Sequence, residues 1–170
     1  QVSSAASDVY KRQELYKDNF RHLNTSSDSE VILNVFAHEL QQASSFNPTP
    51  EQIFQAVEKT HLRLKGAYSV LLMISGVGLI GIRDPKGIRP LILGKKDNDL
   101  IGSDYMMASE SPALSALEFD IEGDLKPGEA VFITLEGEIH RKVCHSNPSK
   151  NPCIFEYVYL ARPDAVIDGI

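Results

Sequence analysis

Three closely spaced apolar runs dominate the middle of the chain. They cover residues 67–74, 77–82 and 91–93, and the dipeptide Ser75-Gly76 joins the first two runs as a hairpin turn would. Apolar residues fall on both alternating faces of these runs, and a strand of that kind must be covered on both sides. The pattern therefore predicts strands of the central sheet of a layered domain.

A charged segment rich in turn-forming residues, Arg-Asp-Pro-Lys-Gly-Ile-Arg-Pro, separates the second run from the third. Asp84, Pro85 and Gly87 occupy the first, second and fourth positions, as a type I turn favours. We interpret Arg83 and Asp84 as residues that shape this turn, in preference to a catalytic pair. The segment therefore predicts a structured turn at the edge of the sheet.

An amphipathic segment at residues 29–43 lies well before the sheet. Its apolar residues recur at helical intervals, which predicts a helix with one buried stripe. The stripe consists of Ile32, Val35, Phe36 and Leu40. Ser27 and Glu30 have the spacing of a capping box, so we expect the helix to begin next to Ser27.

A second helix is predicted to begin at Thr49. Pro50 suits its first helical position, and Gln52 has capping-box spacing from Thr49. His61 lies on the apolar face of this helix, where we expect a packed side chain in preference to a catalytic one. We expect Gly66 to end the helix as a left-handed cap.

Shorter elements follow the third apolar run. Residues 100–103, 131–135 and 138–143 predict strands, the last two joined by a hairpin turn at Glu136-Gly137. Residues 111–117 predict a short helix that begins at Ser-Pro. Two helices followed by many strands with short turns are typical of an antiparallel α+β layer fold.

The two ends of the chain differ in composition from its middle. Residues 1–13 are rich in Ser, Ala and Gln without periodicity, and we expect a disordered tail or one foreign to the fold. Residues 145–152 resemble a polar linker, and the apolar residues 153–160 fit either a helix or a strand. We therefore predict one domain over residues 14–144, and in 145–170 a linker with the start of another domain.

Composition narrows the function classes. The chain of 170 residues suits a single domain, and its net charge of −6 argues against nucleic acid as a partner. No apolar run approaches the roughly 20 residues of a membrane-spanning helix. Two cysteines are too few for a disulfide framework, which fits a reducing, cytoplasmic setting. Since the chain lacks an initiator Met and stops in mid-pattern, we expect it to be a fragment.

The cysteines offer little chemistry on their own. Cys144 and Cys153 are not at zinc-binding spacing, and no pair of histidines completes a metal site. Cys144 precedes His145 directly, but adjacency in sequence does not create a nucleophile and its base. We expect buried or half-buried thiols.

Asp28 is the carboxylate of most interest. Its local setting favours capping of the helix that follows, or compensation of the helix dipole. The alternative is a fixed anion that receives the ammonium group of a ligand, with Thr25, Ser26 and Ser27 holding the carboxylate by hydrogen bonds. The residues alone leave both roles open.

Five segments, in the same order along the chain, resemble the glutaminase domain of the amidophosphoribosyltransferase family. They are residues 22–40, 64–95, 106–120, 125–137 and 151–170. The RDPKGIRPL string occurs across the class II glutamine amidotransferases, asparagine synthetase included. The string PCIFEYVYLARPDAVIDG is the discriminating one, because it is similar to the junction with the phosphoribosyltransferase domain. The resemblance covers about residues 14–170.

The resemblance implies an incomplete four-layer αββα N-terminal-nucleophile hydrolase fold with antiparallel sheets. It also implies that an N-terminal Cys attacks the glutamine side-chain amide, with its own amino group as the base. The released ammonia then displaces pyrophosphate from phosphoribosyl pyrophosphate and gives 5-phosphoribosylamine, the first step of purine biosynthesis. The alternatives are another class II enzyme, such as asparagine or glucosamine-6-phosphate synthase, and a non-catalytic module of the same fold.

The resemblance also assigns residues. The nucleophilic Cys and the oxyanion-hole Asn-Gly pair of the family precede this chain, so we expect no catalytic residue in it and no activity from it alone. Asp28 matches the position that binds the α-ammonium of glutamine. Cys153 lies where some members have an iron–sulfur ligand, but we expect no cluster. We expect no cofactor in this chain, Mg²⁺ in the phosphoribosyltransferase domain, and a homotetramer.

Overall fold

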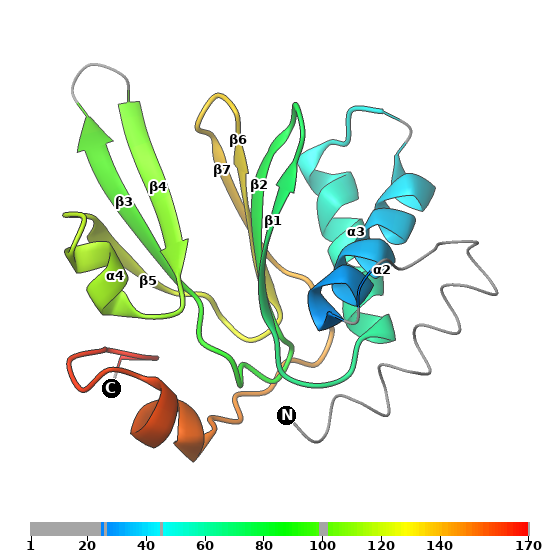
Figure 1. Cartoon of the computed structure of the whole chain (residues 1–170). Helices are drawn as coiled ribbons and strands as arrows, with labels where there is room; N and C mark the ends of the chain where they lie inside the picture. Colours follow the sequence, from blue (N-terminus) through cyan, green and yellow to red (C-terminus); the bar gives the residue numbers. More distant parts are fainter. Residues whose placement is uncertain (1–24, 26, 45, 99–101, 170) are drawn as a thin grey trace. The chain divides into compact units, whose positions relative to one another are not determined.

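The structure is a computed structural model of the chain (Figure 1). The residues that it describes are 25, 27–44, 46–98 and 102–169. The chain divides into two units, Gln1–Gly66 and Ala67–Ile170. Among the described residues, the first unit contains two helices and the second contains the strands, so each unit is described by itself.

In the first unit, helix α2 (Asp28–Ala43) begins at Ser27 as its N-cap, as the sequence predicts. The Ser27 hydroxyl accepts the Ser29 N–H at 3.3 Å. The predicted Ser27–Glu30 capping box is wrong, because the Ser27 hydroxyl does not accept the Glu30 N–H and the Ser27 N–H donates to the Thr25 hydroxyl at 3.2 Å. The Glu30 carboxylate accepts the N–H and the hydroxyl of Thr25, at 2.7 and 2.6 Å. The Glu30 side chain thus binds Thr25 in place of Ser27.

Helix α3 (Pro50–Arg63) has the predicted capping box. The Gln52 N–H donates to the Thr49 hydroxyl at 3.4 Å, and the Thr49 N–H donates to the Gln52 side chain at 2.9 Å. The predicted end of this helix is wrong. Leu64 is already extended and its N–H closes the last turn on Thr60, so the helix ends before Gly66. Gly66 has φ +119°, outside the left-handed helical region.

The two helices pack on one another within this unit. Val31 and Val35 of α2 form a buried cluster with Leu64. An ion pair of 2.7 Å joins Glu39 of α2 to Arg63 of α3. The predicted stripe of α2 is shifted at two positions, since the buried residues are Val31, Val35, Phe36 and Glu39. On α3, His61 is 3% exposed, which confirms a packed side chain.

The second unit contains two antiparallel sheets (Figure 1). The strand order of the first sheet is β1 (Ser69–Ile74), β2 (Gly78–Arg83), β6 (Glu129–Thr134) and β7 (Ile139–Val143). The order of the second sheet is β4 (Gly102–Ala108), β3 (Ile92–Asn98) and β5 (Asp120–Asp124). Helix α4 (Ser111–Ser115) connects β4 to β5, and a π-helical turn, η1 (Glu156–Leu160), follows β7. The predicted α+β fold with antiparallel sheets is confirmed.

The cores of the two sheets meet in a single buried cluster. Its members come from both sheets and from the adjoining loops: Leu91, Leu93, Met107, Leu125, Val131 and Ile133. Gly81 of β2 lies against this cluster, where a Cβ atom would come within 2.4 Å of the Met107 sulfur. The absence of a side chain at Gly81 thus lets the sheets approach closely.

Burial on both faces is confirmed for the predicted runs 77–82 and 91–93 and is wrong for the run 67–74. Every residue of β2 and β6 is buried or half-buried. Strand β1 lies at the edge of its sheet, and Leu71 and Met73 on one of its faces are 47% and 82% exposed. The hairpins β1–β2 and β6–β7 are confirmed.

Three further details differ from the prediction. Strand β5 was not predicted, because its sequence Asp-Ile-Glu-Gly-Asp has no apolar alternation. Helix α4 ends at Ser115, two residues earlier than expected. The segment 153–160, which fitted a helix or a strand, contains the helical turn η1.

Candidate functional site

Asp28 is the first residue of α2, and its side chain is exposed. A carboxylate here lies at the N-terminal, positive end of the helix dipole. The hydroxyls of the neighbouring residues are engaged elsewhere, Thr25 with Glu30 and Ser27 with the Ser29 N–H. These bonds order the turn before α2 and leave the Asp28 carboxylate open to a ligand.

Ser26 lies outside the described residues. Within the described part of the chain, the Asp28 carboxylate forms no hydrogen bond or ion pair with another side chain or N–H group. The expected hydrogen bonds from Thr25 and Ser27 to this carboxylate are thus not formed, and its role in binding an ammonium group stays a prediction.

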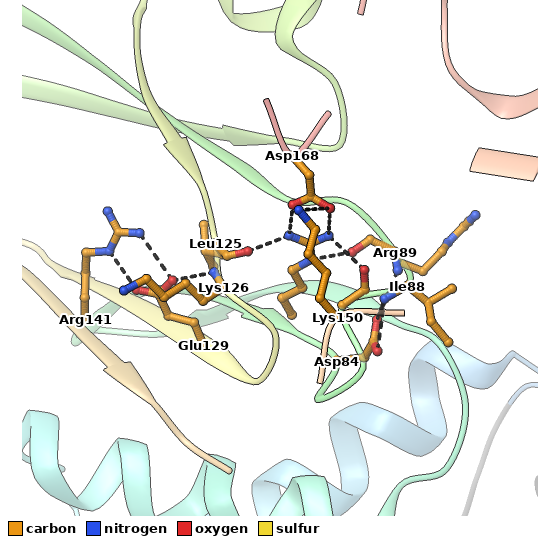
Figure 2. Close-up of polar contacts among 11 residues, drawn as sticks. Asp84, Ile88, Arg89, Leu125, Lys126, Glu129, Arg141, Lys150 and Asp168 are labelled. Atoms are coloured by element: carbon orange, nitrogen blue, oxygen red, sulfur yellow. Dashed lines mark hydrogen bonds and ion pairs between the residues drawn. The ribbon is translucent and has the colours of Figure 1, made fainter. Parts of the chain in front are cut away.

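The charged turn in the second unit is built around a buried carboxylate. Asp84 is 0% exposed, and its side chain accepts the backbone N–H groups of Lys86, Ile88 and Arg89 at 2.9 to 3.3 Å (Figure 2). Its carbonyl accepts the Gly87 N–H at 2.9 Å, which confirms a β-turn at the predicted residues. Asp84 therefore organises the turn from inside.

Arg83 is also buried, at 1% exposed, and uses all five of its N–H donors. Three bonds go to the backbone carbonyls of Gly87, Leu125 and Arg89, at 2.9, 2.6 and 2.9 Å. The other two go to the two carboxylate oxygens of Asp168, at 2.8 and 3.0 Å. Arg83 thus shapes the turn, as predicted, but its charge partner is Asp168 and not Asp84.

Asp168 completes a small group of charges with Asp124 and Lys150 (Figure 2 labels Asp168 and Lys150). Burial works against the charge on Asp168, but the Arg83 guanidinium and the Lys150 ammonium, 3.6 Å away, outweigh it and lower the pKa of the carboxyl. Burial and the nearby Asp168 charge raise the pKa of Asp124. The pKa values of the two carboxyls are therefore shifted in opposite directions.

Two more ion pairs border the turn. Arg141 of β7 donates to both oxygens of Glu129 at 2.9 and 3.3 Å, and Glu129 also accepts the Lys126 N–H at 2.6 Å (Figure 2). Arg89 binds Glu156 of η1 at 2.6 Å. These pairs fix the loop before β6 and the segment that contains η1.

The Arg89–Glu156 pair borders a cavity of about 160 Å³. Its lining is mixed polar and apolar: Ser69, Arg89, Pro90, Ser109, Glu110, Glu156, Leu160, Ala161 and Ile167. Sequence reasoning missed the ion pairs and the cavity. The partners in the Arg83–Asp168 pair lie 85 residues apart, and no local pattern links them.

The two cysteines have the predicted burial. Cys144 is buried, with its thiol 3.5 Å from the Lys142 carbonyl, and Cys153 is half-buried. An iron–sulfur cluster needs several protein ligands. Among the described residues there is no group of three or more His, Cys, Asp or Glu side chains that could hold a metal ion. No helix in the described part of the chain is both long and apolar enough to cross a membrane.

Comparison with known proteins identifies the family of this chain. The family model described as a glutamine amidotransferase domain matches residues 4–116. The amidophosphoribosyltransferase of Pseudomonas aeruginosa is 52% identical over 158 residues, which cover 93% of this chain and 31% of the relative. That of Escherichia coli is 49% identical over 159 residues, which cover 94% of this chain and 32% of the relative.

Solved structures give the same result. The glutamine phosphoribosylpyrophosphate amidotransferase of B. subtilis, complexed with ADP and GMP, is similar with a TM-score of 0.75 and 29% identity. A structure described as the allosteric regulatory enzyme of purine biosynthesis has a TM-score of 0.75 and 31% identity. Each match covers 96% of this chain and 32% of the solved chain.

The two antiparallel sheets and these matches define the class, an N-terminal-nucleophile hydrolase fold of the glutamine amidotransferase type. The chain belongs to the glutamine amidotransferase domain family. Within that family it is similar, over nearly all of its length, to the amidophosphoribosyltransferases. It spans about a third of the length of these relatives.

Proposed function

We propose that the chain is the glutaminase portion of an amidophosphoribosyltransferase. The whole enzyme would hydrolyse glutamine to glutamate and transfer the ammonia to phosphoribosyl pyrophosphate, releasing pyrophosphate and forming 5-phosphoribosylamine. The observation that carries this proposal is the 52% identity with the Pseudomonas aeruginosa amidophosphoribosyltransferase across 93% of the chain. We expect the whole enzyme to be a cytoplasmic homotetramer that binds Mg²⁺ outside these residues.

Asp28 is the residue to which we assign substrate binding. Its carboxylate is exposed, begins a helix, and follows a turn that the Thr25–Glu30 bonds hold in place. A rigidly placed anion of this kind can receive the α-ammonium of glutamine through a charge-assisted hydrogen bond. Asp28 would bind substrate and take no part in bond breaking.

We also propose that these 170 residues do not hydrolyse glutamine by themselves. The nucleophile that the family implies is an N-terminal Cys, and neither of the two cysteines in these 170 residues matches that position. Cys144 is buried with its thiol directed at a backbone carbonyl, which suits neither a thiolate nor access to substrate. Turnover of glutamine by the 170 residues alone would contradict this proposal.

The test uses a full-length enzyme that contains this chain. Asp28→Asn should lower kcat/KM for glutamine roughly 10- to 100-fold, the range of one lost charge-assisted hydrogen bond, while synthesis from free ammonia is kept. Asp104→Asn, which alters an exposed carboxylate on β4, is the matched control and should change neither activity. Equal loss of the glutamine and ammonia activities would count against an ammonium-binding role.

The same assay tests the acceptor. Glutamine-dependent release of pyrophosphate from phosphoribosyl pyrophosphate supports the proposed reaction. Amide transfer to aspartate or to a hexose phosphate, with phosphoribosyl pyrophosphate left intact, would instead favour one of the other class II enzymes.

A further inference from the structure

The turn at residues 83–90 binds both ends of the segment that follows β7. At the near end, the N–H groups of Ser149 and Asn151 donate to carbonyls of the turn at 3.0 and 2.9 Å. At the far end, both carboxylate oxygens of Asp168 bind Arg83. The segment 149–168 is therefore a long loop whose two ends are fixed to the same turn.

Residues that lie between the two ends of the loop also form contacts. Arg89 of the turn binds Glu156 at 2.6 Å, and the Val166 N–H donates to the Ser111 hydroxyl at 2.8 Å. Ile167, next to Asp168, is buried. The path of the segment is thus set mainly by polar contacts with the turn and with α4.

Five apolar side chains of the same segment are exposed. They are 48% to 81% exposed and belong to Ile154, Phe155, Val158, Tyr159 and Leu160. Because Arg83 and the turn hold the ends of the segment, we expect a change at Asp168 to alter the placement of these side chains without touching them.

We propose that Arg83 and Asp168 form a clasp that positions the segment 149–168, so that ammonia released from glutamine reaches its acceptor and is not lost to solvent. This inference rests on the proposed function, because it needs an acceptor site in the part of the enzyme that follows. Arg83 acts here as a positioning residue through the segment. The planar guanidinium group of Arg83 suits this role, since two parallel hydrogen bonds to a carboxylate fix its direction as well as its distance.

The first test measures the clasp itself by amide hydrogen exchange in the full-length enzyme. Asp168→Asn removes the charge and one of the two acceptor oxygens, so exchange at the Asn151 and Val166 amides should accelerate roughly tenfold or more. Asp164→Asn is the matched control, because Asp164 binds Arg162 within the same segment and not the turn. Unchanged exchange in Asp168→Asn overturns the clasp.

The second test measures the use of ammonia, as the number of glutamines hydrolysed per 5-phosphoribosylamine formed. In Asp168→Asn this ratio should rise roughly twofold or more, because small displacements of reacting groups carry large rate penalties. Synthesis from free ammonia should be kept. Faster exchange with an unchanged ratio would show a purely structural contact and overturn the positioning role.

A second variant covers the case in which Asp168→Asn does not fold. Lys150→Gln removes a half-exposed partner 3.6 Å from Asp168 and should move both readouts in the same direction by a smaller amount. No movement in either readout overturns the proposal. An unaltered enzyme that forms no product from phosphoribosyl pyrophosphate contradicts the proposed function, whereas the exchange experiment still tests the clasp.

Discussion

Replacement of Asp84 by Asn tests whether a buried carboxylate organises the charged turn. The wild-type carboxylate accepts three backbone N–H groups, those of Lys86, Ile88 and Arg89, and is fully buried. Asn has nearly the same size but only one acceptor oxygen. Whichever way the amide is turned, its NH₂ group faces at least one backbone N–H that the carboxylate had satisfied.

The magnitude follows from the bonds that are lost. The Asp84 oxygen Oδ1 accepts from Lys86 and Ile88, and Oδ2 accepts from Ile88 and Arg89. The better orientation of Asn keeps two of the three donors satisfied and leaves one buried N–H without a partner, at a cost of about 1–3 kcal/mol. The remaining bonds also lose their charge assistance, and a bond to a charged group contributes about 1.5–3 kcal/mol where a neutral one contributes about 1 kcal/mol. We expect Asp84→Asn to lower the free energy of unfolding by about 3 kcal/mol in total.

The assay is urea unfolding followed by far-UV circular dichroism, because the chain contains no Trp. Asp104→Asn removes an exposed carboxylate from β4 and serves as the control, with an expected change within about 0.5 kcal/mol. A shift for Asp84→Asn no larger than that of the control would refute the reasoning, because it would mean that the three N–H groups find other partners at no cost.

Three further predictions concern the same unit and its chemistry. Gly87→Ala should destabilise by about 1–2 kcal/mol more than Gly76→Ala in urea unfolding, because both glycines have positive φ but only a Cβ at Gly87 would meet Pro127, at 2.7 Å. The pKa of Asp168 is lowered in the folded state, so its contribution to folding stability is present above the pKa of the unfolded state and is lost on acidification. Below about pH 4, the free energy of unfolding should therefore fall less in Asp168→Asn than in the wild type. The pKa of Asp124 is raised, so its protonation in acid removes an unfavourable charge from the folded state. In the same pH series, the free energy of unfolding should therefore fall more steeply on acidification in Asp124→Asn than in the wild type.

Local rules predicted the parts of the fold that depend on neighbours in sequence. The start of α3 follows from Thr49 and Gln52, and the turn at Asp84 follows from Asp, Pro and Gly at fixed positions. The β1–β2 and β6–β7 hairpins are short-range as well, since each pairs adjacent segments. These features involve contacts over a few residues, so propensity and spacing are sufficient to find them.

The features that were not predicted depend on contacts that the hydrophobic pattern does not indicate. Strand β5 is polar and is recruited by pairing with β3, so nothing in its own residues marks it as a strand. The end of α3 depends on the extended backbone at Leu64 and not on the glycine that follows. At the candidate site, the place of Asp28 at the start of α2 follows from its neighbours, but Ser27 and not Asp28 caps the helix, and the assignment of Asp28 to an ammonium group comes from resemblance alone.

The buried charges of the turn are better explained by the arrangement that they impose than by stability. Burying an arginine and its carboxylate partner carries a desolvation cost that can equal the gain from their attraction. Arg83, however, satisfies its five donors only when Gly87, Arg89, Leu125 and Asp168 occupy one relative position. These residues come from three segments of the chain, and an apolar side chain of the same volume would hold them together without fixing their direction. We therefore interpret Arg83 as the residue that sets the position of Asp168 and the segment before it relative to the turn.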